Sequence, residues 1–438
     1  MKFHIETLGC QMNEHDSEKM YHLLRISGFE PADIAADADI VIVNTCSIRK
    51  KAEEKFYSLM GRLRWMKEKK GTILGVTGCI AQMEKEAIQK RLPFIDFSLG
   101  PSNIHKIGQA IETASRHKRF FDFSENGCTS LSFIKPESAK AEIKAYTTIM
   151  KGCNNFCSYC IVPYVRGREA SRHSADILDE VRSRASAGVK EVTLLGQNVN
   201  SYNKGQNDMT FPELLAAING IEGIERIRFV TSHPKDLSAE LIDCFGKLEK
   251  LCEQIHLPFQ AGSDRILNLM NRKYTIEEYK EKVGRLRERC ADIAITSDCI
   301  VGFPGEDDAA FEASMNLVSD IHFDGLFSFI YSPRKHTAAS TLPGTVPRGA
   351  ATERLKRLQE AQKAITLRKH KAMEGRVTEV LVEGPSKNSS EEVMGRTRTN
   401  KIVNFVGKQE MVGTLVNVEI TRGYANSLKG ELRGAEQG

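Results

Sequence analysis

Three short apolar runs punctuate the first third of the chain. Each has the length and composition of a buried strand, and they are FHIETLG (3–9), DIVIVNT (39–45) and TILGVTG (72–78). Stretches with helical spacing of apolar residues follow two of them, around residues 16–26 and 52–69. This alternation is typical of a parallel sheet covered by helices, so residues 1–123 are predicted to form an α/β domain.

A polar, aperiodic stretch over residues 124–144 comes next and is predicted to be a linker. Beyond it, six more runs have the character of strands, and long helical patterns separate most of them. The six runs lie at residues 146–150, 191–195, 226–230, 254–257, 293–301 and 325–330. Repeated β–α units in this number indicate a complete or partial barrel, and we expect a partial (β/α)6 barrel within a domain of residues 145–371.

The pattern changes again near the end of the chain. A strongly basic helix is predicted over residues 352–376, and its thin apolar stripe leaves open whether it is a solvated connector or an RNA contact. The later runs VTEVLVE, IVNFVG and TLVNVEIT alternate with glycine-rich turns. This alternation is typical of a small antiparallel β-barrel, which is predicted to occupy residues 372–438.

The composition is that of an ordinary globular protein, with 41% hydrophobic and 27% charged residues among 438. A net charge of +5 permits a nucleic-acid partner without requiring one, because local patches matter more than the total. The sequence has neither a recognisable export signal nor an apolar run of membrane-spanning length, so a cytoplasmic location is expected. In that reducing compartment the eleven cysteines are expected to be metal ligands or buried thiols rather than disulfides.

The strongest chemical signal is a loop in which Cys153, Cys157 and Cys160 follow directly on a predicted strand. Three thiolates at this spacing can bind three irons of a [4Fe–4S] cluster and leave the fourth iron open to a substrate. A structural zinc site is the alternative. It would need a fourth ligand, for which His173 is the nearest candidate.

Cys10, Cys46 and Cys79 each lie at the C-terminal end of one of the three predicted strands of the first domain. Such ends share one edge of a parallel sheet, so these thiols are expected to converge and to hold a second cluster with an open iron. The alternative is three unrelated thiols near loop starts. The remaining cysteines show no such pattern and are expected to be buried or bystander thiols: Cys128, Cys244, Cys252, Cys290 and Cys299.

A three-cysteine loop at the head of a β/α barrel resembles the radical S-adenosylmethionine (SAM) superfamily. With the upstream cysteines and the small C-terminal barrel, the whole chain resembles the methylthiotransferase family, which implies a cluster domain, a radical SAM domain and a TRAM domain. Several motifs are similar to the branch that acts on isopentenyladenosine beside the tRNA anticodon. They are GCQMN (9–13), NTCS (44–47), GCNNFCSYCIVPYVRGR (152–168), LGQNVN (195–200), TSHP (231–234) and GRT (395–397).

Two other branches provide the alternative substrates. The ribosomal-protein branch would carry Pro-Lys-Asn after Cys10, and the threonylcarbamoyl-adenosine branch usually has Lys-Val-Asn, so Gln11-Met12-Asn13 disfavours both. A non-catalytic zinc protein that binds RNA is the distant alternative. One departure from the family follows residues 332–334, where Lys335-His336 replaces the usual Pro-Gly and puts the conformation of that loop in question.

The resemblance implies that SAM chelates the open iron of the loop cluster and that one electron cleaves it to a 5′-deoxyadenosyl radical. The cluster at Cys10, Cys46 and Cys79 would supply the sulfur, so both clusters must face one cavity and the first domain should lie over the C-terminal end of the barrel strands. No catalytic residue is expected beyond the cluster ligands. Candidate SAM contacts, each with a turn or a core aromatic as its alternative, are Tyr159, Gly196, Gln197, Asn198, Gln260, Ser263 and Gly302.

An adenine stacked in a duplex cannot reach a buried radical, so the RNA must present its base in a single-stranded loop such as the anticodon loop. The C-terminal barrel is expected to grip this RNA. The candidate RNA contacts, of which the aromatics could equally be core, are Arg396, Arg398, Lys401, Phe405, Arg422 and Tyr424. The resemblance also implies an electron-donor protein as a partner, and a monomer without membrane attachment is expected.

Overall fold

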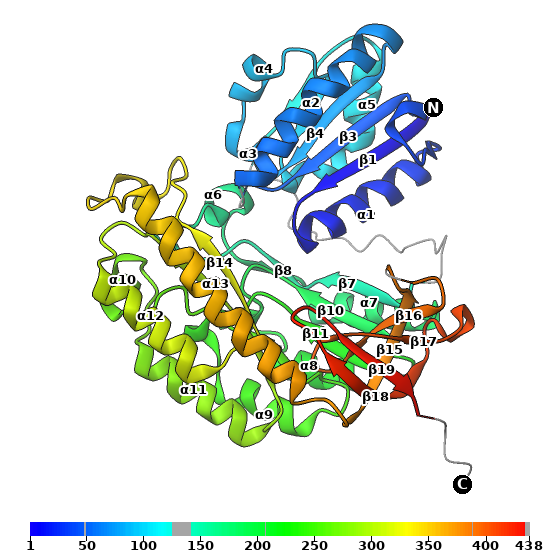
Figure 1. The fold of residues 1–438 in the computed structure, drawn as a ribbon. Helices are drawn as coiled ribbons and strands as arrows, with labels where there is room; N and C mark the ends of the chain where they lie inside the picture. The colour runs from blue at the N-terminus through cyan, green and yellow to red at the C-terminus, as the bar shows by residue number, and fades with distance from the viewer. Residues whose placement is uncertain (48–49, 125–141, 206, 388, 434–438) are drawn as a thin grey trace.

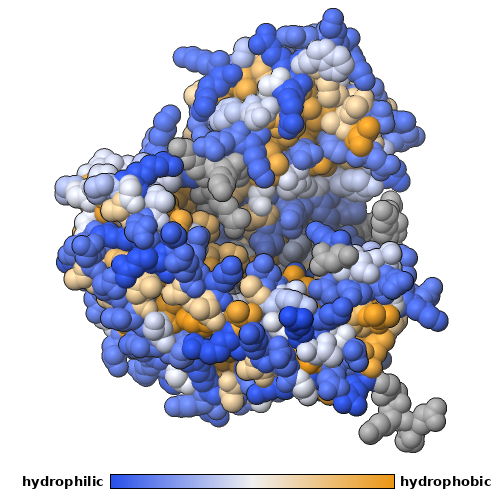
Figure 2. Space-filling model, viewed as in Figure 1, coloured by the Kyte–Doolittle hydropathy of each residue, from blue (hydrophilic) through white to orange (hydrophobic). Residues whose placement is uncertain are grey.

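The computed structural model describes residues 1–47, 50–124, 142–205, 207–387 and 389–433. Three units follow one another along the chain, with the N-terminal unit at one end of the molecule and the other two side by side beneath it (Figure 1). Figure 2 shows that the surface narrows where the N-terminal unit meets the rest. No helix within these described ranges is long and apolar enough to cross a membrane.

The N-terminal unit is a six-stranded parallel sheet in the order β2-β1-β3-β4-β5-β6. Every residue of β3 and β4 is buried, as expected for central strands whose two faces both carry helices. Helices α1 and α5 pack into an apolar core on one face, whereas α2, α3 and α4 pack into a second core on the other. The strands are β1 (Lys2–Leu8), β2 (Glu30–Pro31), β3 (Ile40–Thr45), β4 (Ile73–Gly78), β5 (Phe97–Leu99) and β6 (Phe120–Asp122), and the helices are α1 (Gln11–Ile26), α2 (Lys50–Lys70), α3 (Cys79–Glu84), α4 (Ala87–Arg91) and α5 (Ile107–Ser115).

The central unit contains six parallel strands arranged as two three-stranded sheets, β11-β10-β7 and β12-β13-β14. A single parallel bridge between Ile227 and Leu251 joins the two sheets. Within the described residues β7 and β14 do not pair, so the barrel is partial and these two strands are its edges. The strands are β7 (Lys144–Thr148), β10 (Glu191–Leu195), β11 (Arg226–Phe229), β12 (Gln254–His256), β13 (Ala294–Val301) and β14 (Gly325–Ile330).

Helices cover the outer face of these six strands and complete the predicted partial barrel. They are α7 (Ser174–Ser186), α8 (Phe211–Asn219), α9 (Ala239–Lys247), α10 (Asp264–Leu269), α11 (Ile276–Arg289), α12 (Asp308–Ile321) and the long α13 (Arg348–Lys371), which lies across β14 (Figure 1). A small ribbon of β8 (Met150–Lys151) and β9 (Ala170–Ser171), with α6 (Val162–Arg166) between them, stands at the C-terminal end of β7. Almost all of the predicted linker lies outside the described residues.

The C-terminal unit is a closed five-stranded barrel in the order β15-β16-β17-β19-β18. The prediction of an entirely antiparallel barrel is wrong for one pair, because β17 and β19 run parallel where the barrel closes. The preceding basic helix also ends earlier than predicted, at Lys371, since Gly375 takes a left-handed φ of 80° and its N–H donates to the carbonyl of Ile420. The strands are β15 (Val377–Pro385), β16 (Glu392–Thr397), β17 (Ile402–Val406), β18 (Leu415–Gly423) and β19 (Leu428–Leu432).

The two ends of the partial barrel are covered by different units. The C-terminal barrel lies against the end where the strands begin, where buried Arg226 donates to the carbonyl of Arg396 at 2.7 Å and to the carboxylate of Glu379 at 2.8 Å. The N-terminal unit lies over the opposite end, where Arg334 pairs with Glu53 at 3.1 Å. The C-terminal ends of the strands, where barrel active sites are found, therefore face the N-terminal unit.

Candidate active site

Three cysteines meet at the edge of the N-terminal sheet. Cys10, Cys46 and Cys79 follow the last residues of β1, β3 and β4, and the Cys46 thiol hydrogen-bonds both of the others. All three are free thiols; Cys46 and Cys79 are buried and Cys10 is half-buried. The expected convergence is therefore present, and its cause is the parallel sheet, which brings the ends of neighbouring strands together.

A small amide network fixes the first of these cysteines. The Asn13 amide oxygen lies 3.4 Å from the Cys10 sulfur, and the Asn13 amide nitrogen donates to the Asn44 side-chain oxygen at 3.1 Å. Asn44 in turn donates to the backbone carbonyl of Asn13 at 2.8 Å. On the other side, Gly78 has a φ of 93° and no room for a Cβ, which would lie 2.5 Å from the carbonyl of Thr45.

Two of these thiols are disposed to ionise. A hydrogen bond from Cys46 lowers the pKa of Cys10 to about 6, against the effect of burial, and the charge of Arg166 contributes in the same direction. The same two influences lower the pKa of Cys79 to about 7. The hydrogen bonds of Cys46 with Cys10 and Cys79 raise its own pKa. Because thiolates are the form that binds metal, this set of donors fits an iron–sulfur cluster.

The second set of cysteines lies on the loop between β8 and α6. Cys157 is buried, and the buried guanidinium of Arg272 donates to its sulfur at 3.5 Å. Burial raises the pKa of Cys153 and raises that of Cys160 to about 12. A cation bound beside these thiols would stabilise their ionised forms. Gly152, which begins the loop, has a φ of 75° and would place a Cβ only 2.0 Å from the carbonyl of Arg168.

Helix α6 brings the two cysteine sets to a common junction. Ile161, which follows directly on Cys160, and Val165 of α6 pack with Cys79 in one small apolar cluster. From the same helix, buried Arg166 pairs with Asp16 of α1 at 2.8 Å and hydrogen-bonds Cys79. Helix α6 of the central unit thus places the positive charge of Arg166 beside the thiols of the N-terminal unit.

Among the described residues, no three His, Cys, Asp or Glu side chains surround a position suited to a single metal ion. A four-iron cube has a different requirement, because each of its cysteines binds a separate iron and the ligands need not converge on one centre. Three free thiols on one loop, or at one sheet edge, satisfy that requirement.

Several buried polar atoms at the C-terminal end of the barrel have no hydrogen-bond partner among the residues that the structure describes. They are Asn198 Oδ1, Asn200 Oδ1, Ser232 Oγ, His233 Nε2, Gln260 Oε1 and Tyr331 Oη. Buried polar atoms are normally paired, so this concentration points to a polar ligand. Two of the predicted SAM contacts, Asn198 and Gln260, belong to the set. Gln260 also has a φ of 67°, which is unusual for a residue other than glycine.

The other predicted SAM contacts vary in their surroundings. Gln197 accepts a hydrogen bond from the backbone N–H of Gly152, which ties the end of β10 to the cysteine loop. Gly196 packs against Met150, and Ser263 precedes α10. Tyr159 lies edge-on to Phe303 with ring centroids 6.5 Å apart.

Gly302 lies where helix α13 approaches closely. A Cβ on Gly302 would lie 2.7 Å from the Cβ of Ala351 in α13, and its N–H donates to the buried carboxylate of Glu306 at 2.6 Å. The close approach of this helix explains why residue 302 has no side chain, and the contact of Gly302 with SAM stays a prediction.

The predicted RNA contacts divide into two groups. Arg398 binds the Glu253 carboxylate at 2.7 Å and Lys401 binds that of Asp324 at 3.0 Å, so both join the C-terminal barrel to the central unit. Arg396 likewise pairs with Glu383 and contacts Asn400. Phe405 is fully buried in the barrel core and offers no ring face to a base.

Arg422 and Tyr424 are the two candidates that remain accessible. Both are exposed, and the Arg422 guanidinium lies 5.3 Å from the centre of the Tyr424 ring. The backbone carbonyl of Tyr424 binds His370 at 2.6 Å, which places this pair beside the basic C-terminal end of α13.

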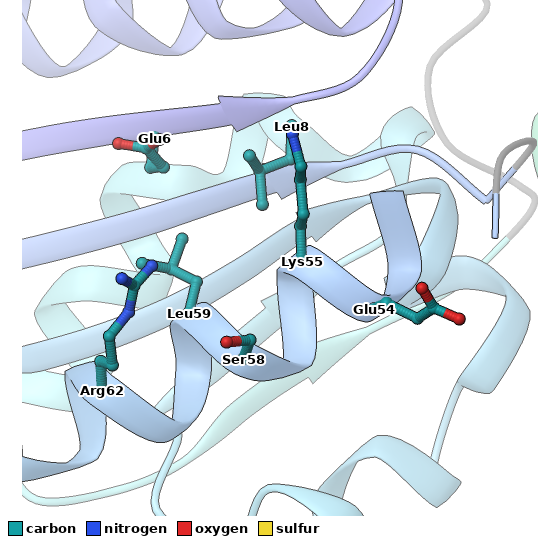
Figure 3. A pocket seen from close by; sticks show the side chains of 7 residues that line it. All are labelled: Glu6, Leu8, Glu54, Lys55, Ser58, Leu59 and Arg62. Atoms are coloured by element: carbon teal, nitrogen blue, oxygen red, sulfur yellow. The ribbon is translucent and has the colours of Figure 1, made fainter. Parts of the chain in front are cut away.

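Other features singled out in the sequence lie apart from this junction. His173, the nearest candidate for a zinc ligand, caps the exposed start of α7. Cys128 lies outside the described residues, and the bystander cysteines Cys244, Cys252 and Cys299 are buried as expected, whereas Cys290 is half-buried. A pocket of about 440 Å³ between β1 and α2, lined by Glu6, Leu8, Glu54, Lys55, Ser58, Leu59 and Arg62, contains none of the predicted site residues (Figure 3).

The sequence did not single out two residues that the geometry makes central. Arg166 stands in the quoted motif GCNNFCSYCIVPYVRGR, so its position after the cysteine loop was a signal that could have been used. Arg272 offered no such signal, because it lies 115 positions beyond Cys157 and reaches it only through the fold.

Three family matches cover most of the chain. Residues 2–100 match the uncharacterized protein family UPF0004, residues 147–318 the radical SAM superfamily, and residues 371–432 the TRAM domain. Over 432 residues, the chain is 50% identical to the tRNA-2-methylthio-N(6)-dimethylallyladenosine synthase of Geobacter metallireducens, covering 98% of each protein. It is 51% identical to the protein of the same name from Syntrophus aciditrophicus, covering 98% of this chain and 94% of that protein.

Among solved structures, the fold is similar to the radical S-adenosylmethionine methyltransferase TsrM from Kitasatospora setae. The TM-score is 0.58 at 13% sequence identity, with 77% of this chain and 75% of that one covered. At this identity the likeness concerns the fold alone.

Proposed function

Because this chain belongs to the family of tRNA-2-methylthio-N(6)-dimethylallyladenosine synthases, which are radical SAM methylthiotransferases, we propose that its two sets of three cysteines hold two [4Fe–4S] clusters. Cys153, Cys157 and Cys160 would hold the cluster that binds SAM. Cys10, Cys46 and Cys79 would hold the auxiliary cluster from which sulfur is supplied. The observation that carries this proposal is the meeting of both cysteine sets at helix α6.

The bound clusters and SAM would supply the one-electron chemistry, and the residues of the chain would bind, orient and shield. Arg272 would stabilise the thiolate of Cys157, and Arg166 would do so for the thiolates of the N-terminal unit. Both guanidiniums are buried, so their charges act in a medium that screens them little. The N-terminal unit over the barrel would keep water from the reacting groups.

SAM would lie at the C-terminal end of the barrel strands. Gln260 and Asn198 support this placement because each has a buried oxygen without a partner, and Gln197 holds the cysteine loop against the end of β10. Tyr159, Gly196 and Ser263 would complete the walls. Gly302 would contribute by allowing α13 to close over its loop.

The tRNA would present its anticodon loop to the side of the partial barrel where β7 and β14 form its unpaired edges. Arg422 and Tyr424, together with the exposed cations Arg368 and Lys371 at the end of α13, would contact its backbone and bases. An electron-donor protein would supply reducing equivalents, and we expect the enzyme to be a cytoplasmic monomer.

Analysis of tRNA nucleosides by mass spectrometry tests this function. Expression of the chain in a strain that lacks its own synthase should convert dimethylallyladenosine to its 2-methylthio derivative. After anaerobic reconstitution, Cys157→Ala should form no 5′-deoxyadenosine, whereas Cys46→Ala should lose methylthiolation and retain some cleavage of SAM. The variant Cys244→Ala, which alters a buried cysteine away from both sets, is the matched control and should retain both activities. Full methylthiolation by either cluster variant would contradict its assignment.

A further inference from the structure

Strand β14 exposes a row of large aromatic side chains. Phe327 is 54% exposed and Phe329 is 38% exposed, although neighbouring Leu326 and Ile330 pack against the barrel core. The helix α13 covers the outer face of this strand (Figure 1). Because side chains alternate between the two faces of a strand, Phe327 and Phe329 face the interior of the partial barrel.

The neighbouring strand continues the same inner wall. Asp298 lies opposite Phe327 in the pairing of β13 with β14, and Ile300 lies opposite Phe329. On β13 the inward residues Asp298 and Ile300 are half-buried, whereas the intervening Cys299 is fully buried beneath the helices. The inner wall is therefore an accessible surface of mixed aromatic and acidic character.

A histidine on β12 connects the acidic and aromatic parts of this wall. The ring of His256 lies 5.9 Å from that of Phe327, edge to face. Its Nε2 is 3.4 Å from a carboxylate oxygen of Asp298, and its Nδ1 is 3.0 Å from the hydroxyl of Thr296. These contacts fix the Asp298 carboxylate beside an aromatic face.

The aromatic row leads from the wall to the cysteine loop. Two residues beyond Phe329, the ring of Tyr331 lies 5.2 Å from that of Phe303, and Phe303 lies 6.5 Å from Tyr159, between Cys157 and Cys160. The Tyr331 hydroxyl is buried and has no hydrogen-bond partner within the described ranges. A flat group resting on the wall would therefore have one end directed toward the proposed SAM site.

We propose that Phe327 and Phe329, with Asp298 held by His256, form the subsite that receives the dimethylallyl-bearing adenine of the tRNA. The aromatic side chains would contact the base and its apolar branch, and Asp298 would accept the single hydrogen bond that the N6–H can donate. This inference rests on the proposed function, and it identifies positioning residues that determine which adenosine is accepted.

The chemistry of the wall favours this substrate over an unmodified adenosine. Exposed apolar surface costs free energy in water, and an apolar group of the ligand relieves that cost. Adenine stacks well on aromatic side chains, and a carboxylate acceptor orients it through the exocyclic amine. An unmodified adenosine would gain the stacking and the hydrogen bond, but the apolar surface that the dimethylallyl group would cover would stay exposed to water.

Kinetics of the reconstituted holoenzyme with two tRNA substrates test the subsite. One tRNA carries dimethylallyladenosine beside the anticodon and the other carries adenosine at the same position. We expect Phe327→Ala to raise KM for the tRNA with dimethylallyladenosine by roughly tenfold and to change binding of the tRNA with adenosine by less than threefold. The ratio of the two affinities should therefore fall. Asp298→Asn should lower the yield of product per 5′-deoxyadenosine released, because the base is held less firmly while SAM cleavage continues.

Trp65→Ala is the matched control, because Trp65 of α2 is 56% exposed and lies outside this wall. Its discrimination ratio should equal that of the unaltered enzyme. Equal losses on both tRNAs for Phe327→Ala, or no change in the ratio, would overturn the inference. If the unaltered enzyme formed no methylthio product, the proposed function itself would fail, and equilibrium binding of the two tRNAs would still decide the subsite.

Discussion

Arg166 illustrates how one side chain can belong to two units at once. It leaves helix α6 immediately after the cysteine loop, pairs with buried Asp16 at 2.8 Å and hydrogen-bonds Cys79. Its charge contributes to lowering the pKa values of Cys10 and Cys79. A single residue of the radical SAM unit therefore helps to set the charge state of the thiols that would bind the auxiliary cluster.

Replacing this arginine should weaken the junction. Arg166→Gln removes the cation from Asp16 and leaves a buried carboxylate unpaired, at a cost of about 3–5 kcal/mol. Because a protein of several units rarely unfolds in one step, the suitable measurement is the first thermal transition, which should fall by roughly 5–10 °C. Arg182→Gln is the control, since Arg182 pairs with Asp179 at the surface and its loss should cost less than about 1 kcal/mol. Equal shifts for the two variants would show that Arg166 is not structural.

The departure at Lys335-His336 also finds its explanation in a single residue. His336 has a φ of 69°, in the left-handed region that a glycine adopts without strain. The Pro-Gly usual in the family would supply a glycine at this position, whereas here a histidine adopts the left-handed conformation at some cost in strain. The loop still reaches the cysteine loop, where Ala339 donates its N–H to the carbonyl of Ser158 at 2.7 Å.

Among the elements, strands with an apolar run of their own were predictable and the shortest strands were not. Strands β10 and β14 begin and end where the sequence predicted, because EVTLL and GLFSFI are mostly apolar and have the length of a strand. The two- and three-residue strands β2, β5 and β6 carry no pattern of their own and exist because a neighbouring strand pairs with them. In the C-terminal barrel, β16 and β19 were missed for a similar reason, as EVMGRT and LKGEL are not apolar runs.

Some residues of the candidate site could be selected from the sequence and others could not. Cys10, Cys46 and Cys79 follow neighbouring strands of a parallel sheet, and Cys153, Cys157 and Cys160 are close together in the sequence itself, so both sets could be selected. Side chains that reach the site across the fold, such as Arg272 and Phe327, gave no local signal. For Arg398 and Lys401, the sequence does not distinguish a cation that joins two units from one that contacts phosphate, because only the structure locates their carboxylate partners.

Helix α13 depends on a glycine that lies outside it. A Cβ at Gly302 would lie 2.7 Å from that of Ala351, and the φ of 69° would be strained for any other residue. Gly302→Ala should therefore destabilise the protein by about 1–3 kcal/mol and displace the helix. Gly349→Ala provides the matched control, because nothing lies within 4 Å of its Cβ position and alanine favours a helix by up to about 1 kcal/mol. Thermal unfolding of the two variants should move in opposite directions; a fall for both would contradict this account.

At the scale of the whole molecule, the partial barrel is closed at each end by a different unit. The N-terminal unit brings its cysteines to the end where the strands finish, and the C-terminal barrel covers the end where they begin. Between these two covered ends, β7 and β14 form the unpaired edges of the partial barrel. The strand that carries the exposed Phe327 and Phe329 is therefore one of these edges.

Two arginines lie on different faces of the C-terminal barrel, so replacing each of them tests whether its face contacts tRNA. Arg422 is exposed beside Tyr424, so Arg422→Ala should weaken tRNA binding and reduce the slope of log affinity against log salt by about 0.7–1, as expected when one phosphate contact is lost. Arg398 is engaged by Glu253 and by backbone carbonyls, so Arg398→Ala should leave that slope unchanged and lower the thermal midpoint instead. Filter binding of tRNA at several salt concentrations measures the slopes. A reduced slope for Arg398→Ala would mean that the face against the central unit opens to meet RNA, and the assignment of the two faces would then have to be reversed.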